Sequence, residues 1–156
     1  MSLMKKNKGF SLIEIMVSVF VLGVGLLGLA KLQAASLKTN QDAIIRSQVT
    51  ILASDMFESM RANQVSATAG GYILADTADP PASPATTTDF DIADWFTNLN
   101  ARVPGSDASI ACSDSDLTDA LPCSIGSVFT ITIFWNGYNQ VSGGRDSQSY
   151  AFIGTL

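Results

Sequence analysis

Two groups near the start of this 156-residue chain could form an ion pair: the carboxylate of Glu14 and, once freed, the backbone amine of Phe10. Three lysines lie within residues 5–8, and an apolar run of about twenty residues, the length that spans a bilayer, begins at Phe10. A secretory signal is ordinarily cut beyond its apolar stretch. Here the plausible cut, after Gly9, lies before it, so processing would remove the lysines and keep the apolar run.

Glu14 is the one acid in that run. Because an ionisable group near the bilayer centre is unfavourable by about 2.5–3.5 kcal/mol, Glu14 needs a positive partner. The free amine of Phe10 would lie one helical turn earlier on the same face. The alternative is a simple signal-anchored membrane protein, which explains the lysines by the positive-inside rule but leaves the acid unexplained.

Cys112 and Cys123, the only cysteines, flank an acidic stretch. Asp114, Asp116 and Asp119 within it supply the hard oxygen ligands that calcium prefers, so they are calcium candidates. Their spacing lacks the glycine and terminal glutamate of an EF-hand. The alternative is that these acids are solvated residues of a turn. A zinc site is not indicated, because two cysteines are too few for a Cys-only site and the chain has no histidine to complete one.

The remaining residues indicate neither an enzyme nor a cofactor site. The chain has no histidine and no serine in a Gly-x-Ser-x-Gly setting. Paired acids such as Asp89 and Asp91 lie in polar, turn-like sequence. The glycines of residues 23–28 spell a dinucleotide-binding pattern, but they lie inside the apolar run, where glycine favours close approach of helices.

The charge balance argues against direct nucleic-acid binding. The chain has nine basic and fourteen acidic residues, and loss of the three leader lysines leaves six against fourteen, a formal charge of −8. An acidic surface repels phosphate backbones, and the remaining cations are spread along the sequence.

One long helix is predicted from Phe10 to about Asn63, roughly 80 Å at 1.5 Å per residue. No proline or glycine interrupts residues 31–61. Polar residues exclude a second membrane span there, and apolar residues recur at helical spacing on one face. These residues are Ile45, Val49, Leu52, Met56 and Met60.

Turn-forming sequence follows, predicted as a surface loop with a short edge strand at Tyr72–Leu74 and a proline-rich part at residues 79–84. A second helix is predicted from about Asp89 to Arg102, capped by Thr88 or Asp89. Its apolar face comprises Ile92, Trp95, Phe96, Leu99 and Val103.

The last third is predicted as sheet. Residues 128–135 alternate, with Phe129, Ile131, Ile133 and Trp135 on one face. Turns are predicted at residues 136–137 and 142–144, and residues 149–153 as an antiparallel neighbour. The expected fold class is α+β, a long N-terminal helix packed on a small antiparallel sheet.

The stretch Lys8-Gly9-Phe10-Ser11-Leu12-Ile13-Glu14, with the apolar run behind it, closely resembles the prepilin leader of type IV pilins and type II secretion pseudopilins. The resemblance implies cleavage between Gly9 and Phe10 by a prepilin peptidase. It also implies N-methylation of Phe10 and pairing of Glu14 with the terminal amine of a neighbouring subunit during assembly. Residues 10–18, 25–30 and 60–63 further resemble minor pilins of the PilV type.

The resemblance implies four parts: a leader at 1–9, a transmembrane and filament-core helix at 10–32, an amphipathic half at 33–63, and a globular α+β domain at 64–156. Before assembly the chain would cross the inner membrane once, with its globular domain in the periplasm, and would afterwards join a pilus fibre at the cell surface. Implied partners are other major and minor pilins, the prepilin peptidase and methyltransferase, and the inner-membrane assembly platform.

Pilins commonly carry one disulfide in their C-terminal region, which the resemblance carries to Cys112 and Cys123. Export to an oxidising compartment would favour the same bridge. In the chain-entropy treatment a loop of this size stabilises by about 3 kcal/mol.

The expected function is that of a minor pilin that primes or joins pilus assembly. Two alternatives stay open: a minor pseudopilin of type II secretion, and a tip adhesin that binds through its proline-rich or cysteine loop.

Overall fold

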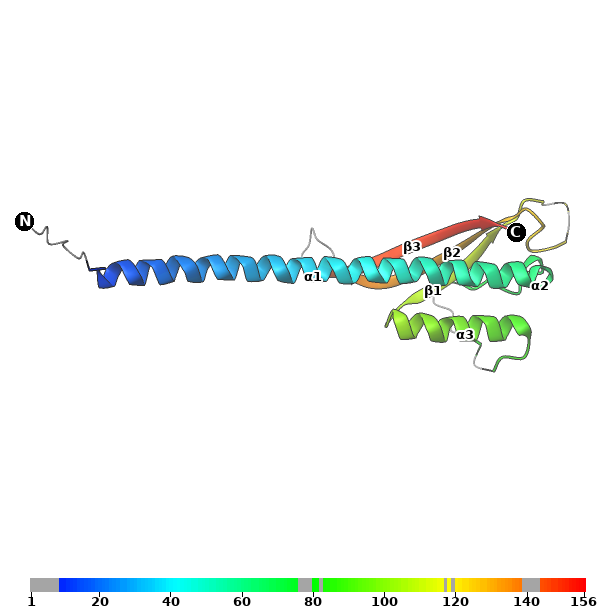
Figure 1. The fold of residues 1–156 in the computed structure, drawn as a ribbon. Coiled ribbons are helices and arrows are strands. Elements are labelled where there is room, and N and C mark those ends of the chain that lie inside the picture. The colour runs from blue at the N-terminus through cyan, green and yellow to red at the C-terminus, as the bar shows by residue number, and fades with distance from the viewer. Residues whose placement is uncertain (1–8, 76–79, 82, 117, 119, 139–143) are drawn as a thin grey trace, which may run out of the picture. The chain divides into compact units, whose positions relative to one another are not determined.

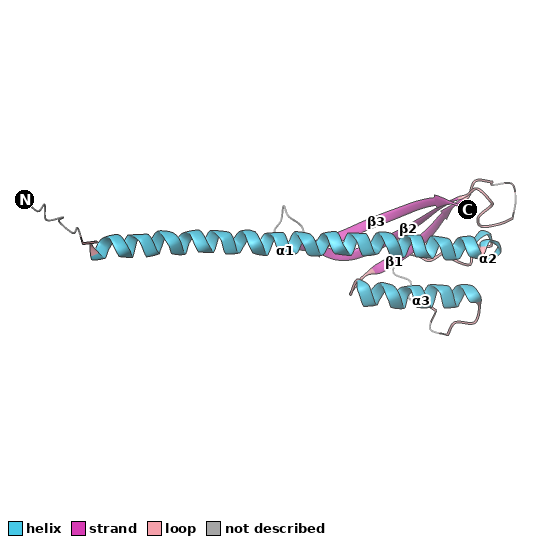
Figure 2. Cartoon of the chain, viewed as in Figure 1, coloured by secondary structure: helices cyan, strands magenta, loops and turns pink. Residues whose placement is uncertain are grey.

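The computed structural model describes residues 9–75, 80–81, 83–116, 118, 120–138 and 144–156 (Figure 1). It divides into two compact units, residues 1–40 and 41–156. The element order is α1 (Leu12–Ala62), α2 (Gln64–Thr68), α3 (Thr87–Arg102), β1 (Asp107–Ser113), β2 (Val128–Tyr138) and β3 (Arg145–Thr155). The three helices precede the three strands of one antiparallel sheet in the chain, which confirms the predicted α+β class (Figure 2).

α1 is a continuous helix of 51 residues, as predicted, and begins two residues later than expected. Its first turn holds Glu14 and its last turn Arg61, charges that suit the partial charges at the two helix ends. Five hydroxyl side chains along it donate to the carbonyl four residues earlier, so the helix itself supplies their acceptors. They belong to Ser18, Thr39, Thr50, Ser54 and Ser59.

The core of the second unit forms where the last third of α1 faces the sheet. The predicted stripe is confirmed, because Val49, Leu52, Met56 and Met60 are buried and Ile45 is partly buried against them. Ala53 and Phe57 add to the same buried face. The apolar residues of one helix side thus cover one face of the sheet.

α3 packs beside α1 with its predicted apolar face buried throughout. The predicted cap was wrong by a few residues: Thr86 caps the helix, and its Oγ1 accepts from the Asp89 backbone N at 3.2 Å. Asp89 completes a capping box by accepting from the Thr86 backbone N at 3.0 Å. Thr88, the predicted cap, is buried instead.

The sheet has the order β1-β2-β3, with both pairs antiparallel. The predicted inner face of β2 is confirmed, since Phe129, Ile131, Ile133 and Trp135 are all buried. β3 is the predicted antiparallel neighbour, paired from Val128↔Thr155 to Tyr138↔Arg145. β1 was not predicted.

The turn predicted at residues 136–137 is wrong, because β2 continues through them to Tyr138. A Cβ at Gly137 would lie 2.6 Å from Gln148 Cγ and 3.1 Å from Trp135 Nε1. Glycine here permits close approach of neighbouring side chains, not a reversal of the chain. Residues 142 and 143 of the other predicted turn lie outside the described residues.

The segment after α1 is not the surface loop that was predicted. It forms α2, and both Ala67 and Tyr72 are fully buried. The predicted edge strand shrinks to one bridge, in which Leu74 and Ile110 exchange two backbone hydrogen bonds of 2.9 Å. Of the proline-rich part, residues 79 and 82 lie outside the described residues.

Candidate functional site

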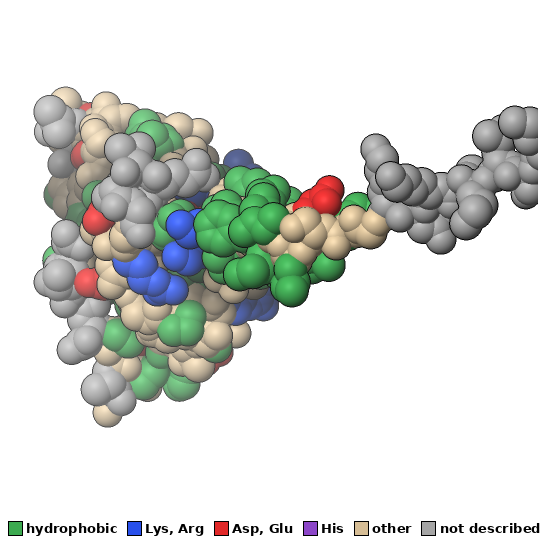
Figure 3. Space-filling view, turned by 90° about the vertical axis from the view of Figure 1, so that its left-hand side faces the viewer, with side chains coloured by type: hydrophobic (Ala, Val, Ile, Leu, Met, Phe, Trp, Pro, Cys, Tyr) green, Lys and Arg blue, Asp and Glu red, His purple; other side chains and the backbone are tan. Residues whose placement is uncertain are grey.

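The described residues of the first unit, 9–40, are all exposed. They include large apolar side chains, from Phe10, which is 80% exposed, to Leu37. By length and composition α1 is able to cross a membrane, and none of its apolar window is buried within the chain. In Figure 3 hydrophobic side chains cover this part of the helix. An exposed apolar surface of this size marks a site of contact with a membrane or with other proteins.

Phe10 and Glu14 lie together at the start of α1. Both line one shallow depression, with Ser18 beside them. Glu14 closes the first turn through its backbone N, which donates to Ser11 O at 3.0 Å. Arg61 and Glu58 form an ion pair, and within the described residues no cation lies within ion-pair distance of Glu14. The geometry leaves its carboxylate available to a cation from outside this segment.

The glycines at 23, 25 and 28 lie inside α1, and not between a strand and a helix. A Cβ built on any of them meets no atom within 4 Å other than neighbouring backbone of the helix itself. Their conformation is ordinary helix, so they leave three small notches in an apolar surface. This placement agrees with the helix-approach interpretation and offers no cradle for a phosphate.

The structure joins Cys112, in β1, to Cys123 by a disulfide with a Cα–Cα distance of 6.3 Å. Cys123 is fully buried, and its backbone N donates to Thr68 O at 3.2 Å. The bridge therefore ties the loop after β1 to α2 and to the core.

Asp114 organises the loop that the disulfide closes. Its Oδ1 accepts hydrogen bonds from Ser124 N at 2.9 Å, Ser124 Oγ at 2.8 Å and Ser127 Oγ at 2.9 Å. These donors, the Ser124 backbone N–H foremost, lower the pKa of Asp114 to about 2. The carboxylate is held by donors of its own chain.

The acids proposed as calcium candidates are thus partly engaged. Asp116 Oδ1 accepts from Thr118 N at 2.9 Å, and hydrogen bonds from the Thr118 side chain and backbone lower the pKa of Asp116. Asp119 lies outside the described residues. Within the described ranges no three acids, cysteines or histidines converge as a metal ligand set would require. Calcium binding stays a prediction for titration calorimetry on the folded protein.

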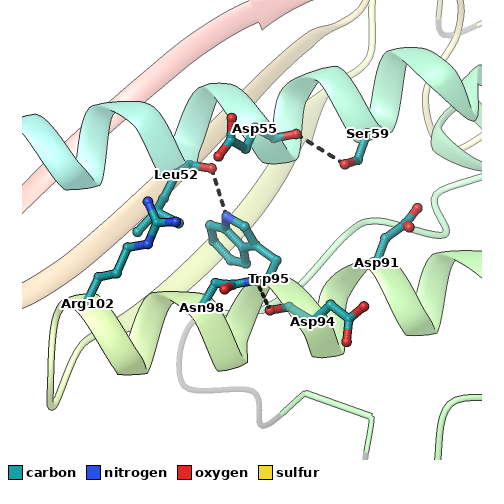
Figure 4. A pocket seen from close by; sticks show the side chains of 8 residues that line it. All are labelled: Leu52, Asp55, Ser59, Asp91, Asp94, Trp95, Asn98 and Arg102. Atoms are coloured by element: carbon teal, nitrogen blue, oxygen red, sulfur yellow. Dashed lines mark hydrogen bonds between the residues drawn. The ribbon is translucent and has the colours of Figure 1, made fainter.

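One pocket escaped the sequence analysis. It lies between α1 and α3, has a volume of about 230 Å³, and is shown with its eight lining residues in Figure 4. Trp95 donates from Nε1 to Leu52 O at 2.8 Å, and Asp55 and Asp94 line the rim. The acids near Trp95 on α3 were the available signal, but the helical spacing predicted only that Trp95 belongs to an apolar face.

Behind this pocket Tyr72, fully buried, donates its hydroxyl hydrogen bond to Asp91. Asn63 Nδ2 donates to Tyr72 Oη and to Thr88 Oγ1, both at 3.4 Å. Burial and the Asp91 contact raise the pKa of Tyr72 to about 12, so the phenol stays protonated. The cluster closes the end of α1 against α3 and holds Asp91, which the sequence analysis placed in polar, turn-like sequence.

Three lysines and Gly9 precede an exposed apolar helix that has Glu14 in its first turn. Residues 4–30 match the prokaryotic N-terminal methylation motif. No curated protein and no solved structure matched the chain. The motif is the prepilin-type leader and supports a type IV pilin-like protein or pseudopilin, a structural rather than an enzymatic class. It implies processing by a prepilin peptidase and assembly with other pilins.

Proposed function

We propose that this chain is a minor pilin, a structural subunit that primes or joins assembly of a type IV pilus. The observation that carries the proposal is the methylation motif at residues 4–30, leading into a helix whose apolar side chains are exposed throughout residues 10–37. Isolated helices of this kind are unstable in water, and in a fibre they would pack on one another.

In this proposal a prepilin peptidase cuts between Gly9 and Phe10, and Phe10 becomes the methylated N-terminus. Glu14 then pairs with the terminal amine of a neighbouring subunit. An unpaired acid in hydrocarbon is unfavourable by about 2.5–3.5 kcal/mol, and a cation beside it offsets that cost only in the correct register. Glu14 would therefore align neighbouring helices during assembly.

Before assembly, residues 10–32 would cross the inner membrane once, and residues 33–63 would continue the helix outside the bilayer. The globular part, residues 64–156, would lie in the periplasm and then on the fibre. The leader at residues 1–9 would stay cytoplasmic. Assembly would involve the inner-membrane platform and other major and minor pilins.

Resemblance at residues 10–18, 25–30 and 60–63 supports the PilV type within this class. A minor pseudopilin would have the same exposed apolar helix, so the helix does not distinguish it from a minor pilin. A gene deletion in the host distinguishes the two. Deletion of the gene should remove pili and leave type II secretion intact. Loss of secretion with normal pili would favour a pseudopilin.

The direct test is N-terminal mass spectrometry of the membrane-expressed protein, produced with a prepilin peptidase, against a Gly9→Val variant. The proposal predicts a mature chain that begins at methylated Phe10 and is absent from the variant. An intact N-terminus, or a cut beyond the apolar run, would exclude the pilin route.

A further inference from the structure

The two edges of the sheet differ. At the β1 edge, Leu74 lies alongside Ile110 and exchanges two backbone hydrogen bonds of 2.9 Å with it. β3, red in Figure 1, forms the other edge. Among the described residues, no backbone hydrogen bond from another element reaches the outer side of β3 between Ser147 and Thr155. The described residues thus cover one edge at Ile110 and leave the second open from Ser147 to Thr155.

From Ser147 to Thr155, β3 lacks the features that normally prevent an open edge from pairing with another chain. Proteins protect such edges with charged side chains, proline, bulges or very short strands. Residues 147–155 contain no charge and no proline. The β2–β3 register runs without a bulge through all eleven pairs. An unprotected strand of this length is a template for strand addition.

The side chains of β3 define what an added strand would meet. Toward α1, Tyr150 and Phe152 are only partly buried, although the ring centroid of Phe57 lies 5.3 Å from that of Phe152. On the opposite face Ile153 is 66% exposed and Ala151 is exposed. A neighbouring strand would therefore complete the cover of two aromatic rings.

The outer face of the whole sheet is almost free of charge, although the chain is acidic. Four rows of side chains cross all three strands on this face, and Asp107 is the one charged residue among them. The rows are Asp107–Phe134–Ser149, Ser109–Thr132–Ala151, Ala111–Thr130–Ile153 and Ser113–Val128–Thr155. β2 and β3 alone form two further rows there, Asn136–Ser147 and Tyr138–Arg145, which add one cation. A second acidic subunit could approach the β3 side of this face with little charge repulsion.

We propose that the outer edge of β3 receives an extended segment of a different helix-anchored subunit, which adds to the sheet as a fourth strand. Two copies of this chain fit poorly. Antiparallel pairing of two β3 edges has a two-fold axis perpendicular to the sheet, which reverses the α1 segment lying along it. The ends at which the two membrane segments attach, Gln41 in each copy, would therefore lie at opposite ends of the pair, which does not suit two anchors in one membrane.

A head-to-tail array of copies is also blocked. It would place β3 of one copy against β1 of the next, and the middle of β1 is already paired at Ile110 with Leu74. The segment that fits is extended, about nine residues long to match residues 147–155, uncharged opposite Ala151, and apolar at alternate positions toward Tyr150 and Phe152.

The contact is small and relies on a shared anchor. One added strand covers much less than the roughly 800 Å² per partner of a stable soluble complex. Two domains held in one membrane or fibre meet at a high effective concentration, which compensates for a small interface. The kind of partner, another anchored subunit, thus rests on the proposed function, whereas the open edge does not.

The test uses the full chain in its host, with a photo-crosslinking amino acid in place of Ile153. The matched variants are Ala151→Lys, at the proposed contact, and Ala111→Lys, an exposed alanine on the same face of the opposite edge strand. We expect one discrete adduct, mapped by mass spectrometry to an extended segment of another subunit with a prepilin leader. Ala151→Lys should reduce it at least tenfold, and Ala111→Lys by less than twofold.

Several outcomes would overturn the proposal: no adduct, an adduct with a second copy of this chain, or equal loss in both lysine variants. Both lysines lie on exposed positions, so matching thermal unfolding midpoints exclude misfolding as the cause. Cleavage at Gly9 is read from the monomer band on the same gels. Failure of processing therefore appears separately from failure of strand addition.

Discussion

The ring of Phe57 on α1 occupies the space that a side chain at Gly154 of β3 would need. A Cβ built on Gly154 would lie 2.4 Å from Phe57 Cζ and 2.7 Å from Cε2. The same ring contacts Phe152 two residues earlier. Helix and edge strand therefore meet at a position where only glycine fits.

Gly154→Ala should destabilise the second unit by about 1–3 kcal/mol, because a methyl group cannot enter without displacing the ring. Chemical denaturation followed by tryptophan fluorescence measures the change. Adding Phe57→Leu in the same chain should recover part of the loss. If the changes in the free energy of unfolding caused by Gly154→Ala and Phe57→Leu were strictly additive, the two positions would not be in contact.

Trp95→Phe should lower the free energy of unfolding by about 1 kcal/mol beyond the effect of the smaller ring, because the hydrogen bond to Leu52 O is lost. Trp95→Ala should cost about 3–5 kcal/mol, since a buried aromatic side chain leaves a cavity. Urea titration of the two variants checks the order. A phenylalanine variant as stable as the parent protein would show that the bond contributes nothing.

Removing the disulfide with Cys112→Ala and Cys123→Ala together should destabilise the protein by about 3 kcal/mol, within the usual 2–5 kcal/mol for a native bridge. The thermal midpoint of the parent protein should fall in dithiothreitol, and that of the double variant should not respond. A reductant effect of equal size in both proteins would point to a cause other than this bridge.

Stability should fall at acid pH partly through Asp114. Its pKa is lowered to about 2 in the folded protein from an ordinary 3.8, so the folded state favours the charged form. The resulting stability is present above about pH 4 and is lost as the pH falls toward 2. Asp114→Asn should flatten this part of the stability profile. Some slope should remain, because the pKa values of Asp89 and Asp116 are also lowered.

If Glu14 sets register, Glu14→Gln should be cleaved and methylated normally but should enter fibres poorly, because the amide keeps the size and loses the charge. Immunoblotting of sheared pili against whole cells gives the incorporated fraction. A Ser18→Ala variant, one turn further along, is the matched control and should be incorporated normally. Full incorporation of the glutamine variant would remove the assembly role.

The fold was predictable where one spacing was sustained. The α1 stripe through Val49 and Met56 and the alternation of β2 have direct physical consequences, because each places apolar residues on one face. β1 was missed because Asp107–Ser113 is short, contains one strongly β-forming residue, Ile110, and gains its stability from β2. Local sequence does not encode that pairing.

The candidate site divides in the same way. The roles of Gly9, Phe10 and Glu14 rest on residues adjacent in sequence, so they could be proposed without a structure and stay predictions. The pocket beside Trp95 and the Asp114 network join residues from separate elements, and the sequence offered only acids in polar surroundings. Gly137 misled because Asn-Gly is a strong turn signal, whereas here glycine relieves crowding against Gln148.

The hydroxyl groups of α1 that donate hydrogen bonds to their own helix affect how easily the helix could move from a bilayer into a protein bundle. Ser18, within the apolar stretch, donates to Glu14 O at 2.7 Å and needs no acceptor from lipid, water or protein. The described helix from Leu12 to Ala30 can therefore leave a bilayer and enter a protein bundle without exchanging a hydroxyl hydrogen bond. Glu14 is the one side chain in that stretch whose charge must find a new environment on arrival. Among the polar side chains of this stretch, the Glu14 carboxylate is therefore the one whose interactions must differ between the bilayer and the bundle.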